Sequence, residues 1–202
     1  MKEITINTAK APVAGLVSGS LGDELVLGIH GWSQRNGRHT WAPLLDFLGE
    51  AGFYAVSVDM PGWGESPAWS SSPISTELAL EALNAIITSL GYKRASLMGK
   101  SWGGAIALEL ALRTPEAVSS LILTAPAFRE PLRLKTLQQP VLLAWSEDDP
   151  VIPYQYASAF IEVIPLVELV TYDSGGHSAG PKNAEHFAPK TVEFLTSHRG
   201  AE

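Results

Sequence analysis

The chain has 202 residues, of which 46% are apolar, and a formal net charge of −7. A chain of this length and apolar content buries one substantial core, so we expect a single domain over residues 1–202. The acidic balance argues against nucleic acid as a partner, since phosphate binding needs a basic face. The lack of cysteine excludes disulfides, thiolate zinc sites and a cysteine nucleophile.

The sequence predicts no targeting or membrane segment. Residues 1–5 begin no signal-peptide core, and no run approaches the roughly 18 apolar residues that a membrane span requires. We therefore expect a cytoplasmic protein that binds no membrane.

Strand-like and helix-like segments alternate along the chain. The expected strands are 4–7, 14–18, 25–29, 54–58, 94–98, 119–123, 141–145 and 167–172. The expected helices are 41–50, 76–90, 102–113, 154–163 and 184–197. Alternation of this kind predicts an α/β fold, with a mostly parallel twisted sheet of seven or eight strands and helices on both faces.

The segment Gly99-Lys100-Ser101-Trp102-Gly103 joins the expected strand 94–98 to the expected helix 102–113. Glycines on either side of a serine let strand and helix approach closely, and the serine then occupies a sharp, strained turn. A serine between glycines also occurs in ordinary turns, but the flanking strand and helix are what a nucleophile elbow requires. The pattern predicts that Ser101 is a nucleophile.

A serine nucleophile needs a general base and a group that orients that base. Asp148 and Asp149 follow the expected strand 141–145, and His177 follows the strand 167–172. Because the carboxyl ends of parallel strands share one edge of a sheet, these side chains are expected to meet Ser101 there. The predicted triad is Ser101, an aspartate and His177.

The combined motifs resemble the α/β-hydrolase fold family. The matching pieces span about residues 25 to 177: His30-Gly31 after the third strand, the Asp-x-Pro-Gly-x-Gly-x-Ser segment at 59–66, the elbow, an Asp-Pro-x-x-Pro segment, and Gly-His. The chain order Ser, Asp, His is the one expected for this family. The resemblance implies that Asp149, directly before Pro-x-x-Pro, is the acid rather than Asp148. It also implies that His30, the main rival of His177, and Asp59 are structural.

The resemblance further implies an oxyanion hole made by the backbone N–H groups of Trp32 and Trp102. Both indoles are then candidates for lining an acyl pocket, with core packing as the alternative. Core packing is at least as strong an expectation for Trp63 and Trp69. Residues 124–140 leave room for one short helix near 132–137 and no cap domain, so the site is expected to be open.

Arg35, Arg38, His39 and Lys100 are expected on the catalytic side of the sheet. They form either a positive rim that steers anionic substrates, with Lys100 and Arg35 as candidate substrate-binding residues, or a solvated loop beside an exposed lysine.

The predicted function is a serine hydrolase of small carboxylic esters that works through an acyl-enzyme. Its expected partner is a small-molecule acyl substrate, and the mechanism needs no cofactor and no metal. Thioesters and acyl amides are substrates of the same chemistry. Two alternatives stay open: a triad-dependent enzyme that cleaves C–C or C–O bonds, and a non-hydrolytic receptor or interaction protein on the same fold. The sequence does not fix the oligomeric state.

Overall fold

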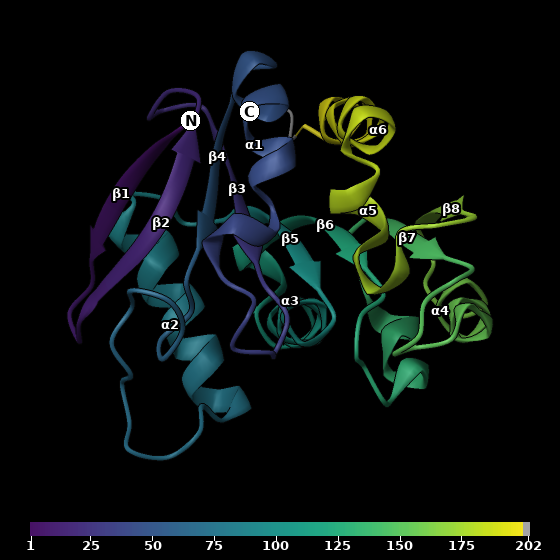
Figure 1. The fold of residues 1–202 in the computed structure, drawn as a ribbon, viewed down its shortest axis with the longest axis horizontal. Coiled ribbons are helices and arrows are strands. Elements are labelled where there is room, and N and C mark those ends of the chain that lie inside the picture. The colour runs from purple at the N-terminus through teal and green to yellow at the C-terminus, as the bar shows by residue number, and fades with distance from the viewer. Residues whose placement is uncertain (200–202) are drawn as a thin grey trace.

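The computed structural model describes residues 1–199, and its centre is one sheet of eight strands in the order β1-β2-β4-β3-β5-β6-β7-β8 (Figure 1). The strands are β1 (Lys2–Asn7), β2 (Pro12–Ser18), β3 (Glu24–Ile29), β4 (Phe53–Val58), β5 (Ala95–Lys100), β6 (Val118–Thr124), β7 (Val141–Ser146) and β8 (Val167–Tyr172). Strand β2 pairs antiparallel with β1 and β4, and the remaining pairs are parallel. The predicted fold class is confirmed.

Helices cover both faces of the sheet. They are α1 (Ala42–Glu50), α2 (Thr76–Ser89), α3 (Trp102–Arg113), α4 (Ala157–Ile161), α5 (Ala179–Lys182) and α6 (Ala184–Ser197). In Figure 1, α1, α5 and α6 lie on one side of the sheet and α2, α3 and α4 on the other. Two apolar clusters match this layering, since each joins side chains from one sheet face to the helices above it. Strands β4 and β7 are buried along their whole length because both of their faces are covered.

The structure differs from the predicted elements after β7. The helix expected over 154–163 is a 3₁₀ turn, Tyr154–Tyr156, followed by the short helix α4. Pro165 disfavours helical backbone at Ile164, so it limits the segment without accounting for the end of α4 at Ile161. Helix α5, which follows the β8 loop directly, is not among the predicted elements.

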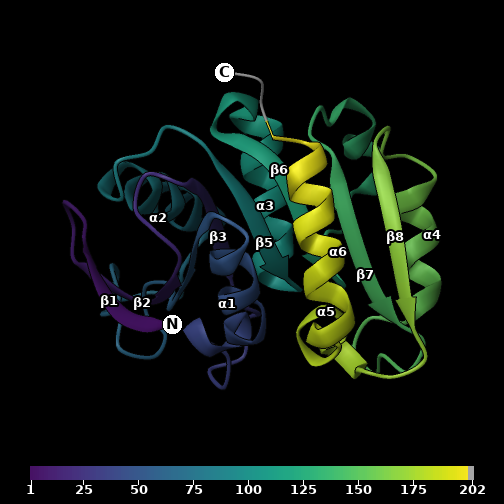
Figure 2. The same cartoon turned by 90° about the horizontal axis from the view of Figure 1, so that it is seen from above.

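The carboxyl ends of the parallel strands lie at one edge, and Figure 2 shows the arrowheads of β7 and β8 there beside α5. Between β6 and β7 the chain forms only a 3₁₀ helix, Pro131–Thr136. No cap domain covers this edge within residues 1–199, as the sequence predicts. None of the helices in the described part of the chain is long and apolar enough to cross a membrane.

Candidate active site

Ser101 lies between β5 and α3 with φ 52° and ψ −115°, in a region that only glycine adopts comfortably. Its backbone is fixed on both sides: its N–H donates to the Thr124 carbonyl at 2.9 Å, and its carbonyl accepts from Ala105 at 3.0 Å and Ala127 at 2.9 Å. A Cβ added at Gly103 would collide with the His30 carbonyl oxygen. The surrounding backbone therefore holds Ser101 in the strained turn that the motif predicts.

Asp149, which is buried, and His177, which is partly buried, form a pair at the same edge. His177 Nδ1–H donates to Asp149 Oδ2 at 2.8 Å, and the Asp149 side chain is fully buried. The other carboxylate oxygen, Oδ1, accepts the backbone N–H groups of Val151 at 2.8 Å and Ile152 at 3.0 Å. Because Nδ1 carries the proton, Nε2 is left as the acceptor nitrogen, which is the tautomer that a general base requires.

The loop that carries His177 and the turn at Ser101 both follow the carboxyl ends of strands, at the same edge of the sheet. His177 Nε2 is buried and has no hydrogen-bond partner within residues 1–199. Directly after it, α5 packs on the end of β6, where a Cβ at Gly180 would lie 2.9 Å from Thr124 Oγ1. Thr124 is also the residue whose carbonyl holds the Ser101 N–H. No hydrogen bond joins Ser101 Oγ to His177 in the described chain, and such bonds often close only when substrate is bound.

Asp148 has a different partner from Asp149. Its Oδ1 accepts the Gly176 N–H at 2.7 Å, and its Oδ2 lies 3.4 Å from the Gly175 nitrogen. Both glycines have positive φ, 139° and 55°, which an L residue adopts only with strain. Asp148 therefore holds the loop that carries His177, whereas Asp149 holds the imidazole itself.

The two backbone groups expected in an oxyanion hole are available. A Cβ at Gly31 would lie 3.6 Å from the Ser101 Cβ, so the start of the loop after β3, which contains Gly31 and Trp32, passes directly beside the serine. The hydrogen bonds of residues 1–199 leave the N–H groups of Trp32 and Trp102 without a protein acceptor. Trp102 is the first residue of α3, where the helix dipole also favours negative charge.

His30 uses both ring nitrogens in the fold. The Met60 N–H donates to its Nε2 at 3.0 Å, and its Nδ1–H donates to the Gly31 carbonyl at 2.7 Å. Burial lowers the pKa of His30 to about 4, although the Gly31 hydrogen bond opposes this. With no free nitrogen, His30 ties the loop after β3 to the loop after β4, which matches the structural role that the resemblance implied.

We expect the His30 imidazole to stay neutral well below its ordinary pKa and to weaken the fold when it becomes charged. Since its folded pKa of about 4 lies below the ordinary 6.5, the unfolded chain takes up this proton first. The contribution to stability is therefore complete above pH 6.5 and is lost as the pH falls toward 4, a loss of about 3 kcal/mol. Long-range ¹H–¹⁵N NMR over this pH range measures the protonation of the His30 ring in the folded protein directly. A folded-state midpoint near the ordinary value would contradict the expectation.

Arg38, one of the residues of the alternative positive rim, is paired with carboxylates. The Arg38 guanidinium pairs with Glu3 at 2.9 Å, Glu65 at 2.8 Å and Asp59 at 3.5 Å. The Asp59 carboxylate also accepts the backbone N–H groups of Arg38 and Glu65, at 2.6 and 3.1 Å. Arg38 is therefore neutralised by carboxylates and braces the turn after β4, with Asp59 as its anchor.

Of the other rim residues, Arg35 is exposed and His39 Nε2 lies 3.1 Å from the Arg35 carbonyl. Lys100 is half-buried rather than exposed, and its Nζ donates to Asn36 Oδ1 at 3.1 Å. Burial lowers the pKa of Lys100, the charge of Lys182 lowers it further, and Asp149 opposes both. Lys100 is thus a half-buried cation directly before Ser101, held by Asn36.

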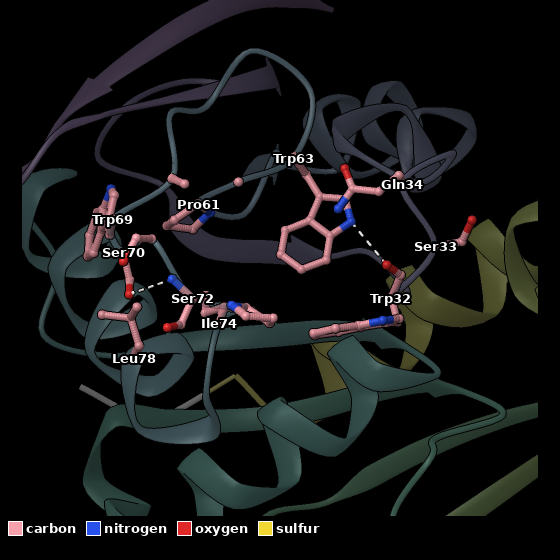
Figure 3. Close-up of a pocket in the computed structure, with 14 residues that line it drawn as sticks. Trp32, Ser33, Gln34, Pro61, Trp63, Trp69, Ser70, Ser72, Ile74 and Leu78 are labelled. Atoms are coloured by element: carbon pink, nitrogen blue, oxygen red, sulfur yellow. Dashed lines mark hydrogen bonds between the residues drawn. The ribbon is translucent and has the colours of Figure 1, made fainter.

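Three tryptophans form a cluster beside Ser101. The Trp63 and Trp102 rings stack at 5.2 Å, and Trp32 meets both edge-on, at 5.3 and 5.4 Å. The Trp63 indole N–H also donates to the Trp32 carbonyl at 3.1 Å (Figure 3). Trp32 and Trp63 wall a cavity of about 570 Å³, to which Trp102 does not belong. Trp102 does not line this cavity, and the expectation that its indole lines an acyl pocket stays a prediction.

The cavity includes Ile74 and Leu78, to which the sequence analysis gave no place in a pocket, and Trp69, for which core packing was at least as strong an expectation. Trp69, Ile74 and Leu78 complete its apolar wall from the loop 59–75 and the start of α2. The bulky side chains in this loop were the feature of the sequence that could have indicated a pocket here. Within residues 1–199, no group of three or more His, Asp or Glu side chains is placed to hold a metal ion.

Residues 24–136 match the family model described as alpha/beta hydrolase fold, and the chain belongs to this family. A curated relative, the 2-hydroxy-6-oxononadienedioate/2-hydroxy-6-oxononatrienedioate hydrolase of Paraburkholderia phymatum, is 34% identical over 105 residues, 50% of this chain and 36% of the relative. The hydrolase of the same name from Escherichia coli K12 is 33% identical over the same length, with the same coverage. The matched part is thus well under half of these relatives.

Solved structures resemble almost the whole chain. A "predicted CIB-like hydrolase" from Thermoplasma acidophilum has a TM-score of 0.87 at 22% identity, covering 97% of this chain and 98% of its own. A bacterial membrane phospholipase A has a TM-score of 0.89 at 20% identity, covering 99% and 87%. The 2-hydroxy-6-oxo-6-phenylhexa-2,4-dienoate hydrolase of Rhodococcus sp. RHA1 has a TM-score of 0.88 at 16% identity, covering 96% and 99%. At these identities the likeness shows the fold alone.

Proposed function

We propose that this protein is a serine hydrolase that cleaves small carboxylic esters through an acyl-enzyme on Ser101. The observation that carries the proposal is the Asp149–His177 pair, whose 2.8 Å hydrogen bond leaves Nε2 unpartnered at the sheet edge that also carries the strained serine. The backbone N–H groups of Trp32 and Trp102 support it, because they are free to bind a developing oxyanion. The open edge, without a cap, fits small substrates that water can reach.

In the first half-reaction, Ser101 Oγ attacks the ester carbonyl carbon and His177 Nε2 takes the hydroxyl proton. The carbonyl oxygen becomes negative and is bound by the two amide N–H groups. The carbon–oxygen bond to the alcohol then breaks, and His177 gives its proton to the departing alkoxide. The products of this step are a neutral alcohol and an ester between the acyl group and Ser101.

In the second half-reaction, water replaces the alcohol. His177 removes a proton from water as the water oxygen attacks the acyl carbon, and the same proton returns to Ser101 Oγ when that ester bond breaks. The carboxylic acid leaves and the free serine is restored. Asp149 stays ionised throughout, because it keeps His177 in one tautomer and stabilises the imidazolium that forms in each half.

Labelling with a fluorophosphonate tests the proposal. We expect one covalent adduct per chain, located on Ser101 by peptide mass spectrometry, since only an activated serine attacks this phosphorus centre at a useful rate. Ser101→Ala should not be labelled, while Ser174→Ala, on the loop before His177, should be labelled like the unchanged protein. Absence of an adduct on the folded protein would contradict the enzyme proposal and favour the binding-protein alternative.

A second candidate is hydrolysis of a carbon–carbon bond with the same residues. It is favoured by the 34% identity over 105 residues to a 2-hydroxy-6-oxononadienedioate hydrolase. A compound of that name has two carboxylates and no ester bond, so its hydrolysis is not the hydrolysis of an ester. The half-buried cation of Lys100, directly before Ser101, suits an anionic substrate of this kind. Turnover of such a dienedioate without turnover of p-nitrophenyl acetate would select this candidate over the ester hydrolase.

A further inference from the structure

We propose that the cavity between Trp32, Trp63 and Trp69 is the acyl subsite and that it selects an uncharged aromatic or branched apolar acyl group. The inference rests on the proposed function and adds to it the class of acyl group. The cavity has about 570 Å³, within the range of roughly 300–1,000 Å³ that is usual for small-molecule sites. Figure 3 shows the Trp63 ring between Pro61 and Trp32. Trp69 and Leu78 lie at the other end of the cavity, and Ile74 lies between that end and Trp32.

The walls of the cavity define the chemistry that they accept. None of the residues lining it carries a charged side chain, and its largest surfaces are the Trp32, Trp63 and Trp69 indoles with Ile74 and Leu78. The polar side chains in the lining are serine hydroxyls and the Gln34 amide, so no positive charge is available to pair with a carboxylate, whereas an aromatic ring gains contact with the indoles. The cavity therefore favours a neutral, flat or branched apolar group over a dicarboxylate.

The order of strands decides which half of the substrate occupies the cavity. Ser101 follows β5, and His177 follows β8, on one side of it in the sheet. The cavity lies between the loops after β3 and β4, on the other side of β5. Since His177 gives its proton to the alcohol, the alcohol must face β8 when the bond breaks. The acyl group then points the opposite way, toward the tryptophans.

The wall and the reacting centre share a residue. Trp32 lines the cavity with its side chain, and its backbone N–H is one of the two proposed oxyanion donors. Its carbonyl accepts the Trp63 indole N–H, and Trp63 stacks on Trp102, the residue after Ser101. Ser101 itself does not line the cavity, and these contacts connect the cavity wall to the residues that would bind the carbonyl oxygen. Seating an acyl group on this wall promotes the chemical step and not binding alone.

Two variants of the cavity test the inference with matched p-nitrophenyl esters. Ser72 lines the cavity, and Ser72→Phe is expected to narrow it. This variant should lower kcat/KM for p-nitrophenyl phenylacetate about 10- to 100-fold while changing that for p-nitrophenyl acetate less than about 3-fold. Ile74→Ala widens the cavity and should shift the preference toward larger acyl groups. Ser89→Phe, an exposed position on α2 away from the cavity, is the matched control and should alter neither ester. Equal losses for both esters in Ser72→Phe would overturn the inference.

A binding measurement separates this inference from the proposed function. Phenylacetate, with its apolar ring and the carboxylate of a reaction product, should quench the tryptophan fluorescence of Ser101→Ala, and Ser72→Phe in that background should weaken its binding about 10-fold or more. Quenching without esterase activity in the unchanged protein would remove the proposed function but keep an aromatic acid site. Esterase activity with no preference among acyl groups would remove the subsite and leave the hydrolase.

Discussion

Ser101→Ala is expected to lower kcat for p-nitrophenyl acetate by about 10⁵- to 10⁶-fold, with the fold intact. The substitution removes only the oxygen that attacks the acyl carbon, and no hydrogen bond of that oxygen to the protein is lost within residues 1–199. Stopped-flow absorbance of released p-nitrophenolate measures the effect, and thermal unfolding followed by circular dichroism checks the fold. Turnover comparable to that of the unchanged protein would place the chemistry elsewhere.

Ser101→Gly is the informative companion of this variant. Both variants lack the nucleophile, but glycine adopts φ 52° without the strain that a Cβ causes there. The strain at one such residue is worth about 1–3 kcal/mol, partly offset by the greater freedom of glycine in the unfolded chain. We therefore expect Ser101→Gly to unfold about 2–4 °C above Ser101→Ala. Equal Tm values would show that the elbow stores no strain.

The sequence predicts most of the fold because its strands and helices have clear ends. The helix expected at 76–90 is observed at Thr76–Ser89, with the Ser75 hydroxyl accepting the Leu78 N–H at 3.2 Å as an N-cap. The elbow is equally readable, since the Gly-x-Ser-x-Gly spacing reflects contacts that exclude any Cβ. Local rules of this kind act over a few residues, so a single sequence contains them.

What the sequence did not predict depends on contacts between distant segments. Arg38 reads as a free loop arginine until the fold brings Glu3 and Glu65 against it. Lys100 reads as an exposed lysine until Asn36 meets its ammonium group. The cavity is formed by the loops after β3 and β4, whose tryptophans sit 31 positions apart in Trp32 and Trp63. No local pattern determines how two such loops pack, so these features could not be predicted from the sequence and follow from the folded structure.

The two adjacent aspartates separate the chemistry of the site from the support of its loop. Asp149→Asn is expected to lower kcat for p-nitrophenyl acetate about 10⁴-fold, because an amide in place of Oδ2 favours the wrong tautomer of His177. The hydrogen bond that is lost is the 2.8 Å contact to His177 Nδ1–H.

Asp148→Asn provides the matched comparison, one residue away and with the same change in charge. Its carboxylate accepts the Gly176 N–H at 2.7 Å, and an asparagine carbonyl can still accept that bond. We therefore expect less than a 100-fold loss in kcat. The Tm should also fall, because a charge-assisted hydrogen bond is about twice as strong as a neutral one, and the neutral asparagine holds the glycine turn before His177 less firmly. If Asp148→Asn proved the more damaging of the two for kcat, with Tm unchanged, the acid would have to be reassigned from Asp149 to its neighbour. The 2.8 Å geometry at His177 would then describe a resting state that rearranges before the reaction.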